Sequence, residues 1–259
     1  MSSLLKNVNK KLVSFYAIVA FFIFWEVAAD MKWIDTQFVP ALSTVLTDLG
    51  KLILNGQIFI HIATSLQRTF LGFGLAGLVA LPLGFILGGW LPKVAKFLNP
   101  LFKTLSQINA FTLFPLFLIL LGIGESSKIG VIFWAALWPI LFTTMAGVQQ
   151  IDPILIKAAR AMGADGFKIF FRVILPGAAT KLATGIKTGM TMAFMMLIGA
   201  EAMGSEAGLG WLIQNSKKNS NIPRVYVGLI TIAIVGLIVS YLLDWLENEL
   251  ITWKEGVKT

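Results

Sequence analysis

The sequence predicts an all-α membrane protein that crosses the bilayer as six helices. Of its 259 residues, 57% are hydrophobic and 13% are charged, whereas soluble domains carry about 25% charged residues. The mean hydropathy is +0.81. The apolar runs are continuous and do not alternate at every second residue, so they favour helices over the strands of a barrel. We expect one membrane domain covering residues 1–259.

The expected spans are the long apolar runs of the chain. Each approaches or exceeds the roughly 20 residues that a helix needs to cross the hydrocarbon of a bilayer. Charged residues are absent from these runs or lie near one end of them. The first run comes after a basic start, as in a signal peptide, but no small-residue cleavage pattern follows the run. We therefore expect an uncleaved helix rather than a signal peptide. The predicted spans are residues 12–29, 69–91, 104–124, 129–150, 182–204 and 225–243.

Lysine and arginine are shared unevenly between the two sides of the membrane in this arrangement. With the N-terminus inside, 14 of the 21 lysines and arginines lie in inner segments and 7 in outer ones. Basic loops tend to stay in the cytoplasm. We therefore expect both termini and residues 152–181 to be cytoplasmic.

Other short-range signals lie within and between the spans. Ala41–Leu54 is predicted to form a short amphipathic helix. G-x-x-x-G spacings, which let helix backbones approach closely, occur at Gly84/Gly88, Gly185/Gly189 and Gly204/Gly208. Prolines, which can kink a helix by removing a backbone hydrogen bond, lie within spans at positions Pro82, Pro115 and Pro139. We interpret these residues mainly as packing features.

The segment 152–181 interrupts the apolar chain with positive charge. Good helix formers over Ile154–Met162 predict a short helix. Gly163 is suited to end that helix, because glycine accepts the left-handed conformation. Asp165 is suited to begin a second helix over Phe167–Val173. The segment's cations are Lys157, Arg160, Lys168, Arg172 and Lys181.

Two interpretations of this segment are open from its chemistry alone. Two short helices around a glycine corner, ended by Pro176, could enter a groove on a cytoplasmic protein. A basic amphipathic loop could equally lie on anionic lipid. We interpret the net charge of +8 as a sign of basic loops beside the membrane rather than of a surface that binds nucleic acid.

The sequence carries no signature of an enzyme. It has no G-x-x-x-x-G-K-[ST] phosphate loop, no H-E-x-x-H and no paired-carboxylate set. Cysteine is absent and His61 is the single histidine, so thiolate and multi-histidine metal sites are excluded. Ionisable groups are nearly absent from the middle of the spans, which argues against transport driven by a proton or sodium gradient.

The central segment resembles the EAA loop of permease subunits of bacterial ATP-binding-cassette importers. That family has the pattern E-A-A-x3-G-x9-I-x-L-P. The present chain matches its spacing with Lys157-Ala158-Ala159, then Gly163, then Val173-Ile174-Leu175-Pro176. It departs from the pattern at Lys157, where the family has glutamate, and at Val173. The change at Lys157 puts in question any salt bridge that the glutamate makes.

Other motifs are similar to the nitrate, taurine and sulfonate branch of these permeases. They are Ser65–Phe73, Leu81–Gly84, Asn99-Pro100, Gly199–Gly204 and Gly208–Ile213. The resemblance implies a six-helix permease of the type I importer fold in the bacterial inner membrane. It also implies that the residues coupling to the ATPase are Lys157, Ala158, Ala159, Arg160, Gly163, Ala164, Asp165, Leu175 and Pro176.

The same resemblance implies partners for the chain. Two copies of it would assemble with two cytoplasmic ATP-binding subunits, and a substrate-binding protein would dock outside. ATP and magnesium would be bound by the ATPase, so no cofactor is expected in this chain. The outer loop 205–224, with Lys217, Lys218 and Arg224, is expected to meet the binding protein.

Glu201 is the notable single residue in the expected spans. An acid near the outer membrane boundary costs free energy unless it is solvated or paired. It is read as a solvated vestibule residue or dimer contact, with a gate on the translocation path as the alternative. Candidate path residues are Glu201, Thr112, Pro115 and Met196.

The transported solute is expected to be a small anion such as a sulfonate, taurine or nitrate. A small organic molecule such as a thiamine-precursor pyrimidine is the nearest alternative. Two rivals belong to other classes: a stand-alone channel or secondary carrier, and a membrane anchor for a cytoplasmic complex. The spacing from Lys157 to Pro176 disfavours the first, and the glycine-rich, proline-containing spans disfavour the second.

Overall fold

The computed structural model describes residues 16–17 and 19–251, and every regular element in that part of the chain is a helix. Among these described residues, four helices are long and apolar enough to cross a membrane. They are α3 (Gln57–Phe85) with the π-helical turn η1 (Ile86–Trp90), α6 (Glu125–Gln149), α9 (Leu175–Ala202) and α11 (Ile222–Leu250). The all-helical class is thus confirmed for the described residues. The shorter helices are α2 (Leu42–Leu54), α4 (Pro92–Ser106), α5 (Phe114–Leu121), α7 (Pro153–Ala161), α8 (Gly166–Ile169), η2 (Phe170–Ile174) and α10 (Leu209–Lys218).

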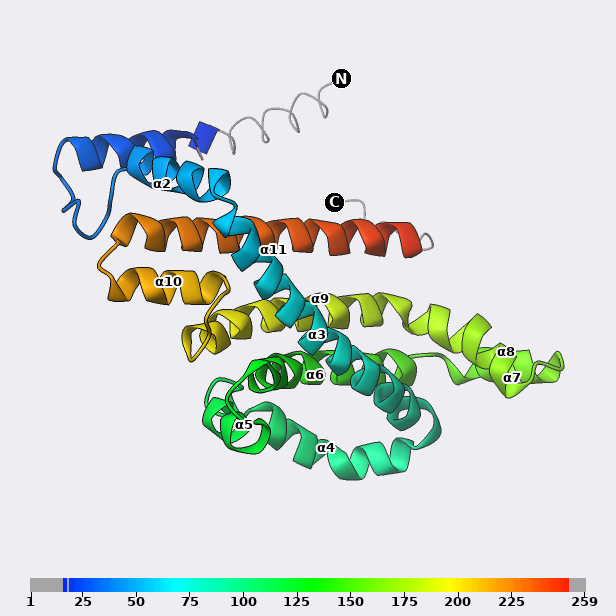
Figure 1. Ribbon diagram of the computed structural model, residues 1–259. Helices are drawn as coiled ribbons and strands as arrows, with labels where there is room; N and C mark the ends of the chain where they lie inside the picture. Colours follow the sequence, from blue (N-terminus) through cyan, green and yellow to red (C-terminus); the bar gives the residue numbers. More distant parts are fainter. Residues whose placement is uncertain (1–15, 18, 252–259) are drawn as a thin grey trace, which may run out of the picture.

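Helix α6 lies at the centre, with α3 packed on one side and α9 on another (Figure 1). Small residues recur at every fourth position of α3 where it crosses α6. A Cβ atom on Gly72 would lie 2.7 Å from Ile132 Cγ2, and one on Gly84 would lie 2.6 Å from Thr144 Cβ. A Cβ atom on Gly189 of α9 would likewise lie 2.8 Å from Ile140 Cγ1. The glycines in these helices therefore set the helix separations, as expected where lipid replaces water.

These contacts give a matched pair of substitutions within α3. We expect Gly84→Ala to destabilise the protein by about 1–3 kcal/mol, because neither Cβ atom can move away by rotamer change. Gly74→Ala should be neutral or stabilising by up to about 1 kcal/mol, because alanine is the better helix former and no atom lies within 4 Å of the added carbon. Unfolding of both variants in mixed micelles, followed by circular dichroism, would measure the difference. Equal effects at the two positions would contradict the crossing.

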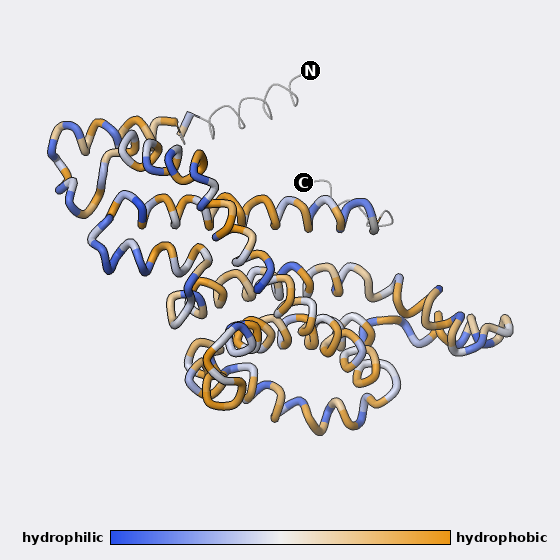
Figure 2. The backbone as a smooth tube through the Cα atoms, viewed as in Figure 1, coloured by the Kyte–Doolittle hydropathy of each residue, from blue (hydrophilic) through white to orange (hydrophobic). Residues whose placement is uncertain are grey.

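The turns of the chain fall at two ends of the bundle, and hydrophilic residues gather there (Figures 1 and 2). One end carries α7 and α8, and the described end of α11 lies on the same side. The opposite end carries α10, the start of α6 and residues 31–41. We call these the α7–α8 end and the α10 end.

The predicted span 104–124 is wrong as a single helix. Residues 107–113 form turns between α4 and α5. The Asn109 side chain accepts a hydrogen bond from Phe111 N at 2.9 Å, which stabilises a turn in place of a helix. Pro115 begins α5 instead of kinking a helix, and Gly122, with φ of +80°, ends it. A run without charges was mistaken for a continuous helix, although Asn, Pro and Gly divide it.

The predicted start of the second span at residue 69 is also wrong. Helix α3 begins at Gln57. His61, Ser65 and Arg68 lie inside the helix and are buried. The predicted span began directly after Arg68, whereas the charge of Arg68 is paired within the protein. The predicted short helix Ala41–Leu54 corresponds to α2.

The remaining spans fall near the helices that the structure shows. Spans 129–150, 182–204 and 225–243 correspond to α6, α9 and α11. The first span, 12–29, lies partly outside the described residues, and residues 19–30 are helical. Ion pairs tie the last helix to its neighbours: Arg224 of α11 binds Asp48 of α2 at 3.0 Å.

Candidate functional site

Helices α7 and α8 form the predicted pair around a glycine corner. The Asp152 carboxylate accepts a hydrogen bond from Ile154 N at 2.8 Å and so caps α7. Gly163 has φ of +78°, the left-handed conformation that follows many helix ends. Ala164 N donates to Ala159 O at 3.0 Å across that corner. Asp165 caps α8 by accepting from Lys168 N at 2.8 Å.

The outer surface of this pair is both apolar and basic. Lys157, Ala158 and Arg160 are exposed, whereas Ala159 is buried against the rest of the segment. Within the described part of the chain Lys157 forms no ion pair. Large apolar side chains are exposed beside these cations, namely Ile154, Leu155, Met162, Phe167 and Phe171. We call this the α7–α8 surface, and clustered exposed apolar side chains of this kind are typical of a contact surface.

Leu175 and Pro176 are half-buried and open helix α9. The prediction that Pro176 ends the second helix is wrong, because one helical stretch continues from Gly166 to Ala202. Proline has no N–H and collides with the carbonyl of the preceding turn. The π-helical turn η2 ends at Ile174, two residues before Pro176, and changes the hydrogen-bond register of the preceding turn.

A cavity of about 610 Å³ separates part of the α7–α8 segment from the bundle. The π-helical turn η1 and the end of α6 line one side of it, and Arg160, Ala164 and Phe170 line the other. The rings of Phe85 and Phe170 meet edge to face at 5.0 Å between centroids. The α7–α8 segment therefore rests on the bundle through few contacts.

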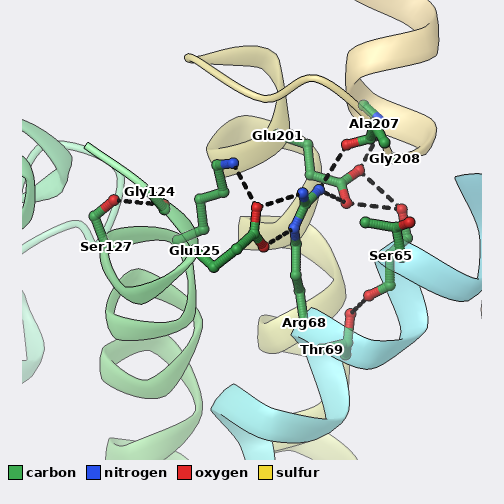
Figure 3. Close-up of polar contacts among 12 residues, drawn as sticks. Ser65, Arg68, Thr69, Gly124, Glu125, Ser127, Glu201, Ala207 and Gly208 are labelled. Atoms are coloured by element: carbon green, nitrogen blue, oxygen red, sulfur yellow. Dashed lines mark hydrogen bonds and ion pairs between the residues drawn. The ribbon is translucent and has the colours of Figure 1, made fainter. Parts of the chain in front are cut away.

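The α10 end holds a buried charge network centred on Arg68 (Figure 3). The guanidinium is 4% exposed and forms a two-bond pair with Glu125 at 2.5 and 2.7 Å. Its Nη1 also donates to Glu201 Oε1 at 2.8 Å and to the Ala207 carbonyl at 2.7 Å. Lys128 Nζ adds a second cation to Glu125 at 3.0 Å. Helices α3, α6 and α9 thus meet at one arginine.

Glu201 is fully paired and shielded from water within the chain. Its side chain is 0% exposed. Besides Arg68, it accepts hydrogen bonds from the Ser65 hydroxyl at 2.8 and 2.9 Å and from Gly210 N at 2.8 Å. The interpretation of Glu201 as a solvated vestibule residue is therefore wrong. The pairing offsets the desolvation of its charge, which an unpaired buried carboxylate could not sustain.

The other candidate path residues lie on a different side of α9 from this network. Thr112 and Pro115 are exposed around the start of α5. Met196 is half-buried and packs on a cluster that contains Phe114 and Ala200. The structure thus brings these three positions to one region and leaves Glu201 facing α3.

Sequence reasoning missed Ser65, Arg68 and Glu125 as site residues. Ser65 and Arg68 stand in one branch motif and Glu201 in another, and the two motifs meet across 133 to 136 positions of the chain. A buried acid requires a nearby cation. The available signal for this pairing was therefore Arg68, an arginine within a long apolar helix. Lys187, near one end of the predicted span 182–204, pairs with Asp244 and Glu247 of α11.

Comparison with known proteins identifies the family. Residues 80–252 match the family of binding-protein-dependent transport system inner membrane components. The chain belongs to this family. It is therefore the permease component of an ATP-binding-cassette importer, a multi-pass inner membrane protein whose family works with a separate ATPase and a binding protein. It is not itself an enzyme.

Relatives of this permease support the same assignment. It is 35% identical to a probable ABC transporter permease of Brucella abortus, over 84% of this chain and 86% of the relative. It is 30% identical to the putative aliphatic sulfonates transport permease SsuC of Bacillus subtilis, over 90% and 84%. The taurine transport permease TauC of Escherichia coli is 29% identical, over 90% and 86%. These relatives confirm the branch that the motifs indicated.

A solved structure shows the same fold. The permease matches a chain of the MetNI methionine ABC transporter in an inward-facing conformation, with a TM-score of 0.59 and 21% identity. The match covers 77% of this permease and 96% of that chain. At this identity the likeness concerns the fold alone.

Proposed function

We propose that the permease forms the path for a small anionic solute, a sulfonate, taurine or nitrate, delivered by an external binding protein. The support comes from relatives that are named for aliphatic sulfonate, taurine and nitrate transport. A small organic molecule such as a thiamine-precursor pyrimidine is the second candidate. The proposed path residues remain Thr112, Pro115 and Met196. Glu201 is proposed to affect the path without contacting the solute, because its carboxylate is occupied by Ser65, Arg68 and Gly210 N.

We further propose that residues 152–181 couple the permease to a cytoplasmic ATPase. The observation that carries this proposal is the α7–α8 surface, where exposed apolar side chains lie beside Lys157 and Arg160 at one end of the bundle. ATP and magnesium bind to the partner, and this chain supplies the contact. Lys157 stands where the family pattern has glutamate, so an acidic group on the ATPase is its expected counterpart.

The proposed assembly has two copies of the permease, two ATPase subunits and six helical crossings per copy. Both termini lie in the cytoplasm with the α7–α8 end. This orientation is supported by the position of the described end of α11, which lies on the same side of the bundle as α7 and α8 (Figure 1). The lysines and arginines within 152–181 also support a cytoplasmic position for the α7–α8 end.

The test is solute uptake by cells that contain the permease together with the ATPase and the binding protein of the same importer. We expect ATP-dependent uptake of labelled taurine, ethanesulfonate or nitrate, and co-purification of the ATPase with the permease. Cells lacking only the permease are the control. Uptake of none of the three anions would overturn the solute class. A permease that purifies without any ATP-binding subunit would overturn the coupling role.

A further inference from the structure

The segment 203–210 comprises the connection after α9 and the first two residues of α10, and side chains from outside the segment hold it. Arg68 Nη1 donates to the Ala207 carbonyl at 2.7 Å, and Gly208 N donates to His61 Nδ1 at 3.2 Å. Leu209 N donates to Ser65 Oγ and Gly210 N donates to Glu201 Oε2, both at 2.8 Å. The first N–H groups of a helix have no partner within it. At α10 these groups are satisfied by α3 and α9.

Close packing adds to these hydrogen bonds. A Cβ atom on Gly208 would overlap the Glu201 carboxylate. A Cβ atom on Gly210 would lie 2.7 Å from Ile198 O. Gly208 also has φ of +117°, a conformation that other residues rarely adopt. The start of α10 is therefore seated directly on the carboxylate of Glu201, whose negative charge is favourable at a helix N-terminus.

The far end of α10 presents charge to solvent. Lys217 and Lys218 are exposed in its last turn. In the described part of the chain neither lysine forms an ion pair. Seating the start of α10 fixes the direction of the helix and so fixes where these cations lie at the α10 end. An acidic protein surface is the partner whose charge complements them.

We propose that Ser65, Arg68 and Glu201 are positioning residues for transport: they hold segment 203–210 and α10 in the geometry that engages an acidic face of the binding protein. This inference rests on the proposed function. It assigns a role to the buried network that the α7–α8 surface and the candidate path residues leave unexplained. It also separates Glu201 from solute contact, since its carboxylate is occupied by Ser65, Arg68 and Gly210 N.

The absence of cysteine allows a direct test of the hold on this segment. Ser205 is 9% exposed, so Ser205→Cys places a single buried thiol in it. In the complete complex purified in detergent, Ser65→Ala should speed maleimide labelling of that thiol about tenfold, because lost caps cost about 1 kcal/mol or more. The matched control is Ser127→Ala, another buried serine of the α10 end, whose hydroxyl donates to Gly124 O. Equal labelling rates in all three proteins would overturn the proposed hold.

The second measurement concerns engagement of the binding protein. ATP hydrolysis by the reconstituted complex is followed against the concentration of binding protein with saturating taurine, ethanesulfonate or nitrate. Ser65→Ala should raise the half-saturating concentration about tenfold and retain the maximal rate per assembled complex, as about 1.4 kcal/mol of lost binding predicts. Raising the salt concentration should weaken engagement of the Ser127→Ala control and the unsubstituted protein alike.

Two results would overturn the inference. One is an unchanged half-saturating concentration when labelling of Cys at position 205 is faster. The other is a lower maximal rate with no change in half-saturation, which a purely structural role would produce. Failure of the proposed function looks different, because the unsubstituted complex itself would then show no stimulation by the binding protein with any of the three anions.

Discussion

Replacing Arg68 with glutamine is expected to destabilise the permease by about 3–5 kcal/mol, because it leaves a buried carboxylate without its cation. The Glu201 side chain is 0% exposed and therefore has no water to replace the guanidinium. The same change removes the donor to the Ala207 carbonyl. Unfolding by SDS titration in mixed micelles, monitored by circular dichroism, measures the loss.

Two further variants separate pairing from general damage at this site. The double variant Arg68→Gln/Glu201→Gln should be less destabilised than the sum of the single changes, because no unpaired buried charge remains. Glu125→Gln should cost about 1 kcal/mol or less, since its side chain is 57% exposed and water can solvate the broken pair. Additive losses in the double variant would show that the Arg68–Glu201 charges are not coupled.

Replacing Gly163 with proline is expected to reduce uptake about tenfold or more. Disturbing a backbone conformation with positive φ costs about 1–3 kcal/mol, and a barrier raised by about 1.4 kcal/mol slows a rate tenfold. Proline fixes φ near −65°, whereas Gly163 has φ of +78°. The substitution also removes the hydrogen bond from Gly163 N to Arg160 O. ATP-dependent uptake and co-purification of the ATPase would both be measured.

Gly166→Pro is the matched control, three residues along the same segment. Gly166 is the first residue of α8, a position that accepts proline. The preceding Asp165 has φ of −75° and ψ of 171°, which suits a residue before proline. We expect uptake close to that of the unsubstituted permease. Equal losses for the two prolines, or none for Gly163→Pro, would contradict coupling through the corner.

Features that depend on neighbours in sequence could be predicted from the sequence. The cap at Asp165 and the turn at Gly163 each depend on a few consecutive residues, and the structure shows both. Helix α2 was likewise placed to within one residue at its start. The span 104–124 failed for the converse reason. Its charge-free composition was considered, and the local turn formed by Asn109 was not.

The charge network could not be predicted in the same way, because its members come from three distant helices. Arg68 was left just outside the predicted span, and Glu201 was interpreted as a solvated residue. Each residue is costly in hydrocarbon when taken alone. Their separate costs become acceptable only through a pairing across 133 positions of the chain. Only the packing of α3 and α9 on α6 brings them together.

The uninterrupted helix from Gly166 to Ala202 has a mechanical consequence. Its 37 residues span about 55 Å at 1.5 Å per residue. One end carries α8 and the other ends beside Glu201, while Lys187 ties the helix to α11 between the two. Continuous helical backbone therefore joins α8 to the Glu201 end over this distance, without any relay of side chains between them.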